Sequence, residues 1–260
     1  MDLAPTACLN CDTPVTGPYC SRCGQEHAQA ASLSAGVAFF DVLDAVVQVN
    51  GALARAAVDL VLRPGVLTAD YLAGRRARHP PPAKLYLVVN VVFFVAVQWF
   101  DPVPARDIAD LVGPAVYAVA QRGSGLSPAL FAAGAEQRMG DALATFLVLF
   151  VPAIAVMLRG LYPSRPLGTV GHAVFGFHLM AFLLLAFLPG TILAGPTGDV
   201  LISVALYAAL PLWTAVALRR AYGGSVGWTL LRTGALWLGI VLLLAAYAAG
   251  LAAYSVAAAG

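Results

Sequence analysis

Four cysteines near the amino end form the pattern with the clearest chemistry. Cys8 and Cys11 make one CxxC pair, and Cys20 and Cys23 make a second. Each CxxC turn places two thiolates on one side of a tight bend, and two such turns supply the four soft ligands of a closed tetrahedral zinc site. A segment this short cannot build its own core, so bound zinc would supply the folding free energy, on the order of 10–16 kcal/mol. The sequence predicts a structural zinc ribbon in residues 1–27.

The function of this zinc-ribbon head has two interpretations. It either docks a cytoplasmic protein partner or only caps the remainder of the chain. A redox role is disfavoured, because thioredoxin-like CxxC motifs begin a helix in a βαβ context that the sequence lacks. No signal-peptide pattern precedes the cysteines, so we expect them in the reducing cytoplasm, where clustered thiols bind metal more often than they form disulfides.

Two histidines within an apolar segment are the next candidates for function. His172 and His178 are six residues apart, so on a helix they lie about 120° apart around the axis and about 9 Å apart along it. They cannot readily hold one metal ion together. An ionisable side chain inside a membrane segment is a candidate for function, because placing it there is energetically costly. The alternative is that each histidine is neutral and hydrogen-bonded to a neighbouring helix.

Basic residues form two further groups of candidates. Arg159, Arg219 and Arg220 lie at expected helix ends, where such side chains either anchor the helix at the interface or bind a ligand. The second group has two interpretations. It attracts anionic lipid head groups, each charge contributing about 1 kcal/mol near the surface, or it only sets the orientation of the spans in the membrane. Its members are Arg75, Arg76, Arg78 and Lys84.

The composition places these residues in a membrane protein. Of the 260 residues, 60% are hydrophobic and 11% are charged, and the mean hydropathy is +0.82. About a quarter of the residues are charged in ordinary soluble domains. We predict an all-α integral membrane protein with about five transmembrane helices, whose partners include membrane lipid. The net charge of +2 is small, and no nucleic-acid partner is expected.

Five apolar blocks approach the length of about 20 residues that a helix needs to cross a bilayer. They form a predicted polytopic domain over residues 84–260. Pro152, Pro189 and Pro211 are expected to kink or end three of the spans. The spans are predicted near residues 84–101, 141–158, 172–193, 199–218 and 229–255.

Residues 28–83 connect the head to the first span. Apolar residues recur at three- and four-residue intervals between Gly36 and Leu62, which predicts an amphipathic helix that ends before Pro64-Gly65. A basic juxtamembrane segment and a triple proline follow, and the triple proline is expected to act as a rigid spacer.

The loops predict the orientation of the spans. All of the 15 basic residues except Arg106, Arg122 and Arg138 lie in segments that alternate onto the amino-terminal side. By the positive-inside rule the amino terminus is cytoplasmic, and the carboxyl terminus is periplasmic or external. This orientation agrees with the reducing environment expected for the thiols. We therefore predict a multi-pass protein of the inner membrane.

Several motifs together resemble a known bacterial family. They are "CxxC…CxxCGQ", "YLAGRRARHPPPAKLYL", "HAVFGFHLMAF" and "ALRRAYG", and they extend over most of residues 8–232. The chain is similar to the membrane proteins grouped as domain of unknown function 3667, although residues 102–140 match nothing in that pattern. The resemblance implies a zinc-ribbon head on a polytopic helical domain, and it implies no activity. The matching positions are Tyr71, Gly74, Arg75, Pro82, Pro152, His172, Phe175, His178, Arg219 and Tyr222.

Three functions are compatible with these observations. The first is a non-catalytic membrane-anchored zinc-ribbon adaptor or scaffold, and it is preferred because it explains why the head and the spans share one chain: the bilayer would localise the head. The second is a small permease or transporter subunit, suggested by a faint repeat between "LRGLY" and "LRRAY". The third is a lipid-modifying membrane enzyme that uses His172, His178 and the nearby arginines around a head-group phosphate.

Overall fold

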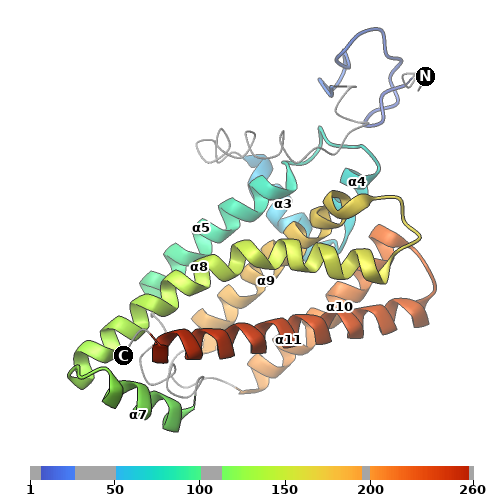
Figure 1. The fold of residues 1–260 in the computed structure, drawn as a ribbon. Helices are drawn as coiled ribbons and strands as arrows, with labels where there is room; N and C mark the ends of the chain where they lie inside the picture. Colours follow the sequence, from blue (N-terminus) through green and yellow to red (C-terminus); the bar gives the residue numbers. More distant parts are fainter. Residues whose placement is uncertain (1–6, 27–50, 101–112, 195–199, 258–260) are drawn as a thin grey trace.

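The computed structural model describes residues 7–26, 51–100, 113–194 and 200–257, and this part of the chain is mostly helical. Within these residues there is no strand, and two isolated β-bridges lie in the head. The all-α prediction is therefore confirmed here (Figure 1). In chain order the helices are α3 (Gly51–Leu62), α4 (Val66–Leu72), α5 (Pro82–Phe100), α7 (Pro114–Gly123), α8 (Pro128–Leu161), α9 (Gly168–Ala194), α10 (Val200–Tyr222) and α11 (Val226–Ala257).

Helix α9 lies at the centre of the helical body. It packs most extensively against α5 and α8, and it also contacts α10, α4 and α3. A helix that is apolar on every side is stable only when every side is covered by other apolar groups. Its buried side chains include Phe175, Leu179 and Phe182, and the Phe182 ring stacks on Trp213 of α10 with 3.7 Å between centroids.

Helix α11 lies on the outside of the body, against α8 and α10. Within the described residues, two helical stretches are long and apolar enough to cross a membrane, Gly168–Phe187 in α9 and Val226–Tyr247 in α11. The most apolar window is 67% buried in α9 but only 22% buried in α11. Burial in a core therefore accounts for the apolar character of α9 and not for that of α11.

Each of the five predicted spans overlaps one helix over its described residues; the helices are α5, α8, α9, α10 and α11. The helix bounds differ most at α8, which begins at Pro128 instead of near residue 141. Residues 102–140 are therefore not simply a loop, since they contain α7 and the start of α8. The side-chain hydroxyl of Ser127 accepts a hydrogen bond from the N–H of Leu130 (3.4 Å) and caps α8, while Pro152 and Pro211 lie inside helices without ending them.

The segment between the head and the first span also differs from the prediction. The residues expected to form a basic spacer begin with a short helix, α4, and the triple proline runs into α5, whose first residue is Pro82. The predicted amphipathic helix is confirmed from Gly51 to Leu62 as α3, whereas its earlier part and the linker, residues 28–50, lie outside the described residues.

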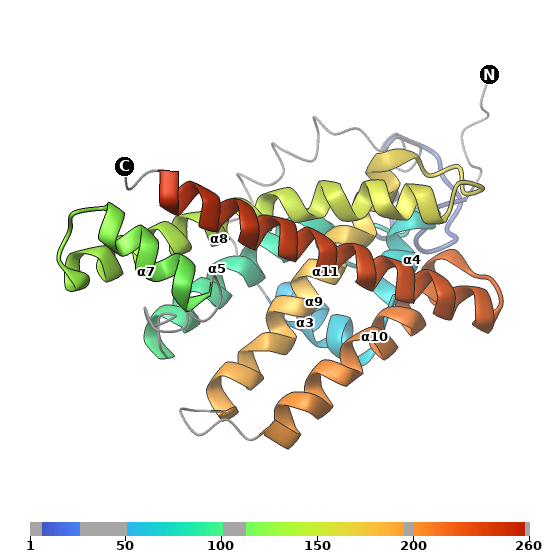
Figure 2. The same cartoon turned by 60° about the horizontal axis from the view of Figure 1, so that its bottom comes forward.

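The two ends of the helical body carry different features. The connections between α8 and α9 and between α10 and α11 lie at the same end as α4 and the head (Figures 1 and 2). Helix α7 and the end of α11 lie at the opposite end in both views.

The turn between α3 and α4 is held against α10. The indole N–H of Trp213 donates to the carbonyl of Val61 (3.2 Å), and Arg220 donates to the carbonyl of Pro64 (2.7 Å). Gly65 has φ +75°, and a Cβ atom at this position would lie 2.6 Å from the carbonyl oxygen of Ala217. This turn requires glycine for its backbone conformation and for its close approach to α10.

Gly65→Ala should destabilise the protein by more than the left-handed conformation alone can explain. That conformation costs an alanine about 1–2 kcal/mol, and the overlap with Ala217 adds about 1–3 kcal/mol. Gly125→Ala is the control, because Gly125 has φ +65° and no atom within 4 Å of the added Cβ. Thermal unfolding of the purified variants in detergent measures both effects. Equal losses in the two variants would show that the contact with α10 is unimportant.

Candidate metal centre

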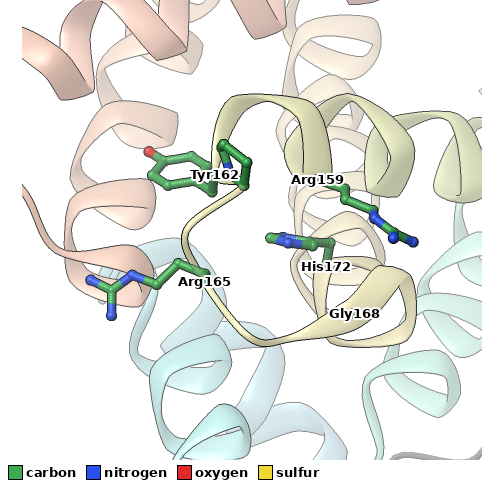
Figure 3. Close-up of a pocket in the computed structure, with 6 residues that line it drawn as sticks. Arg159, Tyr162, Arg165, Gly168 and His172 are labelled. Carbon is green, nitrogen blue, oxygen red and sulfur yellow. The ribbon is translucent and has the colours of Figure 1, made fainter.

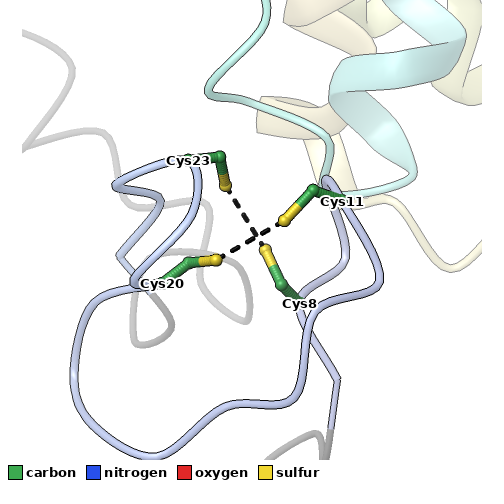
Figure 4. Close-up of side chains that lie close together, drawn as sticks. All are labelled: Cys8, Cys11, Cys20 and Cys23. Atoms are coloured by element: carbon green, nitrogen blue, oxygen red, sulfur yellow. Dashed lines mark hydrogen bonds between the residues drawn. The ribbon is translucent and has the colours of Figure 1, made fainter.

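The four cysteine side chains converge on one point in the head. Their Sγ atoms all lie within 4.8 Å of one another, and none of the four forms a disulfide. The sulfurs of Cys8 and Cys23 are 3.6 Å apart, and those of Cys11 and Cys20 are 3.5 Å apart (Figure 4). Each CxxC pair thus contributes one partner to each close contact. Four converging thiols form a donor set that is suited to a soft, tetrahedral metal ion.

Each CxxC pair lies in a knuckle with the same backbone hydrogen bonds. In each knuckle the N–H of the first cysteine bonds to a carbonyl five residues later, and its own carbonyl accepts from an N–H four residues later. In the first knuckle these bonds are Cys8 N to Thr13 O (2.9 Å) and Asp12 N to Cys8 O (2.8 Å). In the second they are Cys20 N to Gln25 O (2.9 Å) and Gly24 N to Cys20 O (2.9 Å).

The residue that closes each knuckle has a left-handed backbone. It is Asp12 in the first knuckle (φ 57°) and Gly24 in the second (φ 72°). Glycine adopts this conformation without a steric penalty, and aspartate is one of the residues that tolerates it. Gly24 thus has a conformational role in the second knuckle.

Local hydrogen bonds separate the acidities of the thiols. Hydrogen bonds with the side chain and backbone of Thr13 lower the pKa of Cys11 to about 6. The backbone N–H of Gln25 lowers the pKa of Cys23, whereas burial raises the pKa of Cys8 to about 11. Metals bind the thiolate form, so the cluster already offers thiolate character at neutral pH and would release protons when it is filled.

Gln25 joins the head to the helical body. Its side-chain N–H donates to the carbonyl of Gly74 (2.8 Å), and its Oε1 accepts from the N–H groups of Arg76 (3.0 Å) and Ala77 (3.2 Å). Gln25 is buried, so these three bonds satisfy an amide that water does not reach. On the other knuckle, Leu9 packs so closely on Gly74 that an added Cβ would lie 2.7 Å from its Cδ1.

The loop that receives Gln25, residues 73–81, is fixed to α4 by Asp70. Arg75 donates twice to Oδ1 of Asp70 (2.6 and 2.9 Å), and the Nε2 of His79 lies 3.1 Å from Oδ2. Burial alone would raise the pKa of Asp70, but the hydrogen bonds from Arg75 and His79 outweigh it and hold the pKa below its ordinary value. The carboxylate therefore remains charged at neutral pH and orders the loop.

The predicted lipid-binding cluster is divided by these contacts. Arg75 is engaged with Asp70, and the guanidinium of Arg76 lies 5.0 Å from the ring centroid of Tyr71. Arg78 is exposed and Lys84 is partly buried. Half of the predicted cluster thus makes contacts within the protein, and its binding of lipid stays a prediction.

The two histidines lie apart, and each is hydrogen-bonded to a different helix. Nδ1 of His178 lies 2.9 Å from the hydroxyl of Thr68 in α4, with both side chains buried. Nδ1 of His172 lies 3.0 Å from the hydroxyl of Tyr222 at the end of α10. His178 is hydrogen-bonded to a neighbouring helix, which is the second of the two interpretations of the histidines, and His172 lies at the edge of a pocket (Figure 3).

The three candidate arginines also separate. Arg159 donates to the hydroxyl of Thr169 (2.8 Å) and lines the same pocket as His172. Arg220 supports the carbonyl of Pro64, and Arg219 is exposed. Arg165, which also lines the pocket, was not predicted as a candidate, although its place in a short basic loop was visible in the sequence.

The comparison with protein families adds one finding. Residues 51–94 match the family described as "Protein of unknown function (DUF3667)". The resemblance inferred from the sequence is confirmed over this segment. No curated protein and no solved structure matches the chain.

The DUF3667 segment contains α3, α4, the loop that binds Gln25 and most of α5. It does not contain the four cysteines, which lie in the head that docks on it. The matched segment is therefore the part of the chain to which the candidate metal centre is attached.

Gln25→Ala should release the head from the loop. The N–H of Ala77 would lose its acceptor, so we expect its hydrogen exchange to accelerate by about tenfold or more. The N–H of Arg76 would keep the carbonyl of Gly74 (3.1 Å) as an acceptor, so its exchange should accelerate less. Gln25→Glu retains an acceptor oxygen for Ala77 and replaces the donor to Gly74 with an oxygen that repels its carbonyl, so the exchange of the Ala77 N–H should accelerate less than in Gln25→Ala. Hydrogen-exchange mass spectrometry of residues 73–81 measures both. Unchanged exchange in Gln25→Ala would contradict the docking.

Proposed function

We propose that the protein is a non-catalytic membrane adaptor whose zinc-bound head presents a docking surface in the cytoplasm. The observation that carries this proposal is the buried contact of Gln25, two residues after Cys23, with three backbone groups of the DUF3667 segment. A head that only had to hold a metal would not need this contact. The contact of Gln25 fixes the head in one orientation, and a head that is already ordered loses less conformational entropy when it binds a partner.

The metal in this proposal is zinc, and its role is structural. Four cysteine ligands leave no open position for a substrate or water, which is typical of structural zinc sites. The head also lacks the packed core that would hold four mutually close sulfurs together without an ion. Zinc would supply that free energy on binding.

The proposed setting is the inner membrane, with five spans and a cytoplasmic amino terminus. The outward side chains of α11 support it, because Leu231, Leu238 and Leu242 are each at least 60% exposed. Water would oppose exposing such a surface, and lipid would not. The connection after α8, which carries Arg165, and the end of α10, which carries Arg219 and Arg220, lie at the end of the body that carries the head (Figure 2). The positive-inside rule requires this placement for a cytoplasmic amino terminus.

The lipid-modifying alternative needs both histidines around one head-group phosphate, whereas the permease alternative rests on the repeat between "LRGLY" and "LRRAY". Thr68 occupies the Nδ1 of His178, and His172 is engaged with Tyr222 on another helix. These separate contacts do not favour a role in which both histidines bind one phosphate. The adaptor remains the function that the contacts favour.

The purified full-length protein should contain one zinc ion per chain. Cys23→Ser removes one of four ligands and should abolish retention of the metal after dialysis. Ser21→Ala is the control, because Ser21 is exposed and lies between the two cysteines of the same knuckle. Elemental analysis by mass spectrometry gives the stoichiometry. Wild-type protein without zinc would overturn the proposed centre.

A photo-cross-linking residue placed on the head should capture a cytoplasmic protein in living cells. Tyr19 is the position to use, because it is 60% exposed, and Leu242 on α11 has the same exposed fraction. The Tyr19 position should give a protein adduct that Cys23→Ser abolishes, and the Leu242 position should give lipid adducts. Mass spectrometry identifies both. An adduct that survives Cys23→Ser, a periplasmic adduct, or no adduct at Tyr19 would contradict the adaptor.

A further inference from the structure

Helix α3 has apolar side chains on two separate faces. Leu53, Ala56 and Leu60 are at most 3% exposed and pack on the helical body. On the other side of the helix, Val58 and Leu62 are 56% and 72% exposed. We call this second face the outward face, and its members lie within about 100° of one another around the helix axis. They are Ala54, Val58, Val61 and Leu62, and all four are exposed.

The charged residues of α3 and its last turn occupy a third face. Arg55, Asp59 and Arg63 follow at four-residue intervals, so they lie within about 80° of one another, between the buried face and the outward face. Arg63 donates to the carboxylate of Asp59 (3.4 Å), and both arginines are exposed. A helix on the surface of a soluble protein carries polar residues over the whole face opposite its core. An exposed apolar face beside a separate charged face is instead the pattern of a helix at the boundary between lipid and water.

Contacts with α10 place the carboxyl end of α3 at the depth of such a boundary. Trp213 donates to the carbonyl of Val61, and Arg220, in the last turn of α10, donates to the carbonyl of Pro64. Trp213 and Arg220 are seven residues apart, which is about 10 Å along the helix. In the proposed orientation Arg220 marks the cytoplasmic head groups. Val61 then lies deeper by a distance similar to the about 5–10 Å to which interfacial helices insert.

The outward face is too small to hold a protein partner by itself. Helix α3 has 12 residues, so one face of it is about 18 Å long and about 10 Å wide. Its area is therefore about 180 Å², whereas a specific protein interface buries about 800 Å² on each partner. Lipid chains are fluid and need no complementary surface, and binding to them scales with the apolar area that is buried. The size of the face thus favours lipid over a second protein.

We propose that α3 is an interfacial helix whose outward face inserts among the acyl chains of the cytoplasmic leaflet. Arg55 and Arg63 lie at the lipid head groups, where their charge is hydrated. The inference rests on the membrane setting proposed above, and it adds a lipid contact outside the five spans. Helix α3 continues through the turn at Gly65 into α4 and the loop that binds Gln25. The lipid contact therefore holds the docking site of the head close to the membrane surface.

Fluorescence quenching by spin-labelled lipid tests this contact in the full-length protein. A genetically encoded fluorescent residue replaces Val58, and the protein is reconstituted in vesicles of phosphatidylcholine and phosphatidylglycerol. Part of the phosphatidylcholine carries a nitroxide, either near the glycerol end or near the methyl end of one acyl chain. The residue at Val58 should lose more emission with the nitroxide near the glycerol end, because an interfacial helix inserts only about 5–10 Å. Leu62 is a second position on the same face and should behave alike.

Two control positions accompany these measurements. Arg55 is the matched control, because it is exposed on the charged face of the same helix. A fluorescent residue at Arg55 should lose less emission than one at Val58 with either lipid. Leu242 on α11 tests the membrane setting separately, because it is 60% exposed and lies within the apolar stretch Val226–Tyr247. The residue at Leu242 should lose more emission with the nitroxide near the methyl end, since a span crosses the centre of the bilayer.

The pattern of quenching separates this proposal from the membrane setting on which it rests. Quenching at Leu242 without quenching at Val58 and Leu62 would show that protein covers the outward face. The cover would be a second copy or the chain before Gly51, and this proposal alone would be wrong. Equal quenching at Arg55 and Val58 would also overturn it, because the two faces would then meet the same medium. No quenching at Leu242 would contradict the membrane setting itself.

Discussion

The hydrogen bond between Thr68 and His178 is the contact on which the arrangement of the amino-terminal half depends. A polar side chain inside an apolar body must find a partner, because an unpaired one costs about 1–3 kcal/mol. His178 extends from the central helix α9, and Thr68 lies on the short helix α4 (2.9 Å). This bond positions α4 on the body. Asp70 then orders the loop that follows α4, and that loop receives the head.

The sequence was sufficient where one local rule decides the structure. Cys8, Cys11, Cys20 and Cys23 could be assigned to one cluster because the CxxC spacing determines the bend around each pair. Five apolar blocks could be assigned to helices because only helices bury their backbone polar groups within a long apolar run. Their membrane crossings remain a proposal, since a core helix such as α9 has the same composition.

The sequence was insufficient where distant residues decide the structure. In the sequence, Gln25 has no feature that marks it as a contact residue. Its role depends on the loop after α4, which places Gly74 and Ala77 beside it. The start of α8 was missed because Ser127-Pro128 is a weak signal within a polar stretch, although it is a regular cap and first turn. The contact of Arg165 with the carbonyl of Tyr222 forms only because the loop after α8 turns toward the end of α10. No rule of residue spacing predicts that two such distant segments meet.

The two knuckles of the head differ in how easily the unfolded chain adopts their backbone conformation. They share one hydrogen-bond pattern, but the left-handed position is an aspartate in the first and a glycine in the second. Outside a folded head, glycine visits this conformation freely and aspartate visits it less often. The Cys20–Cys23 bend is consequently the better nucleus for assembly. An arriving ion would meet two organised sulfurs there first, and the amino-terminal bend would close over it in a second step.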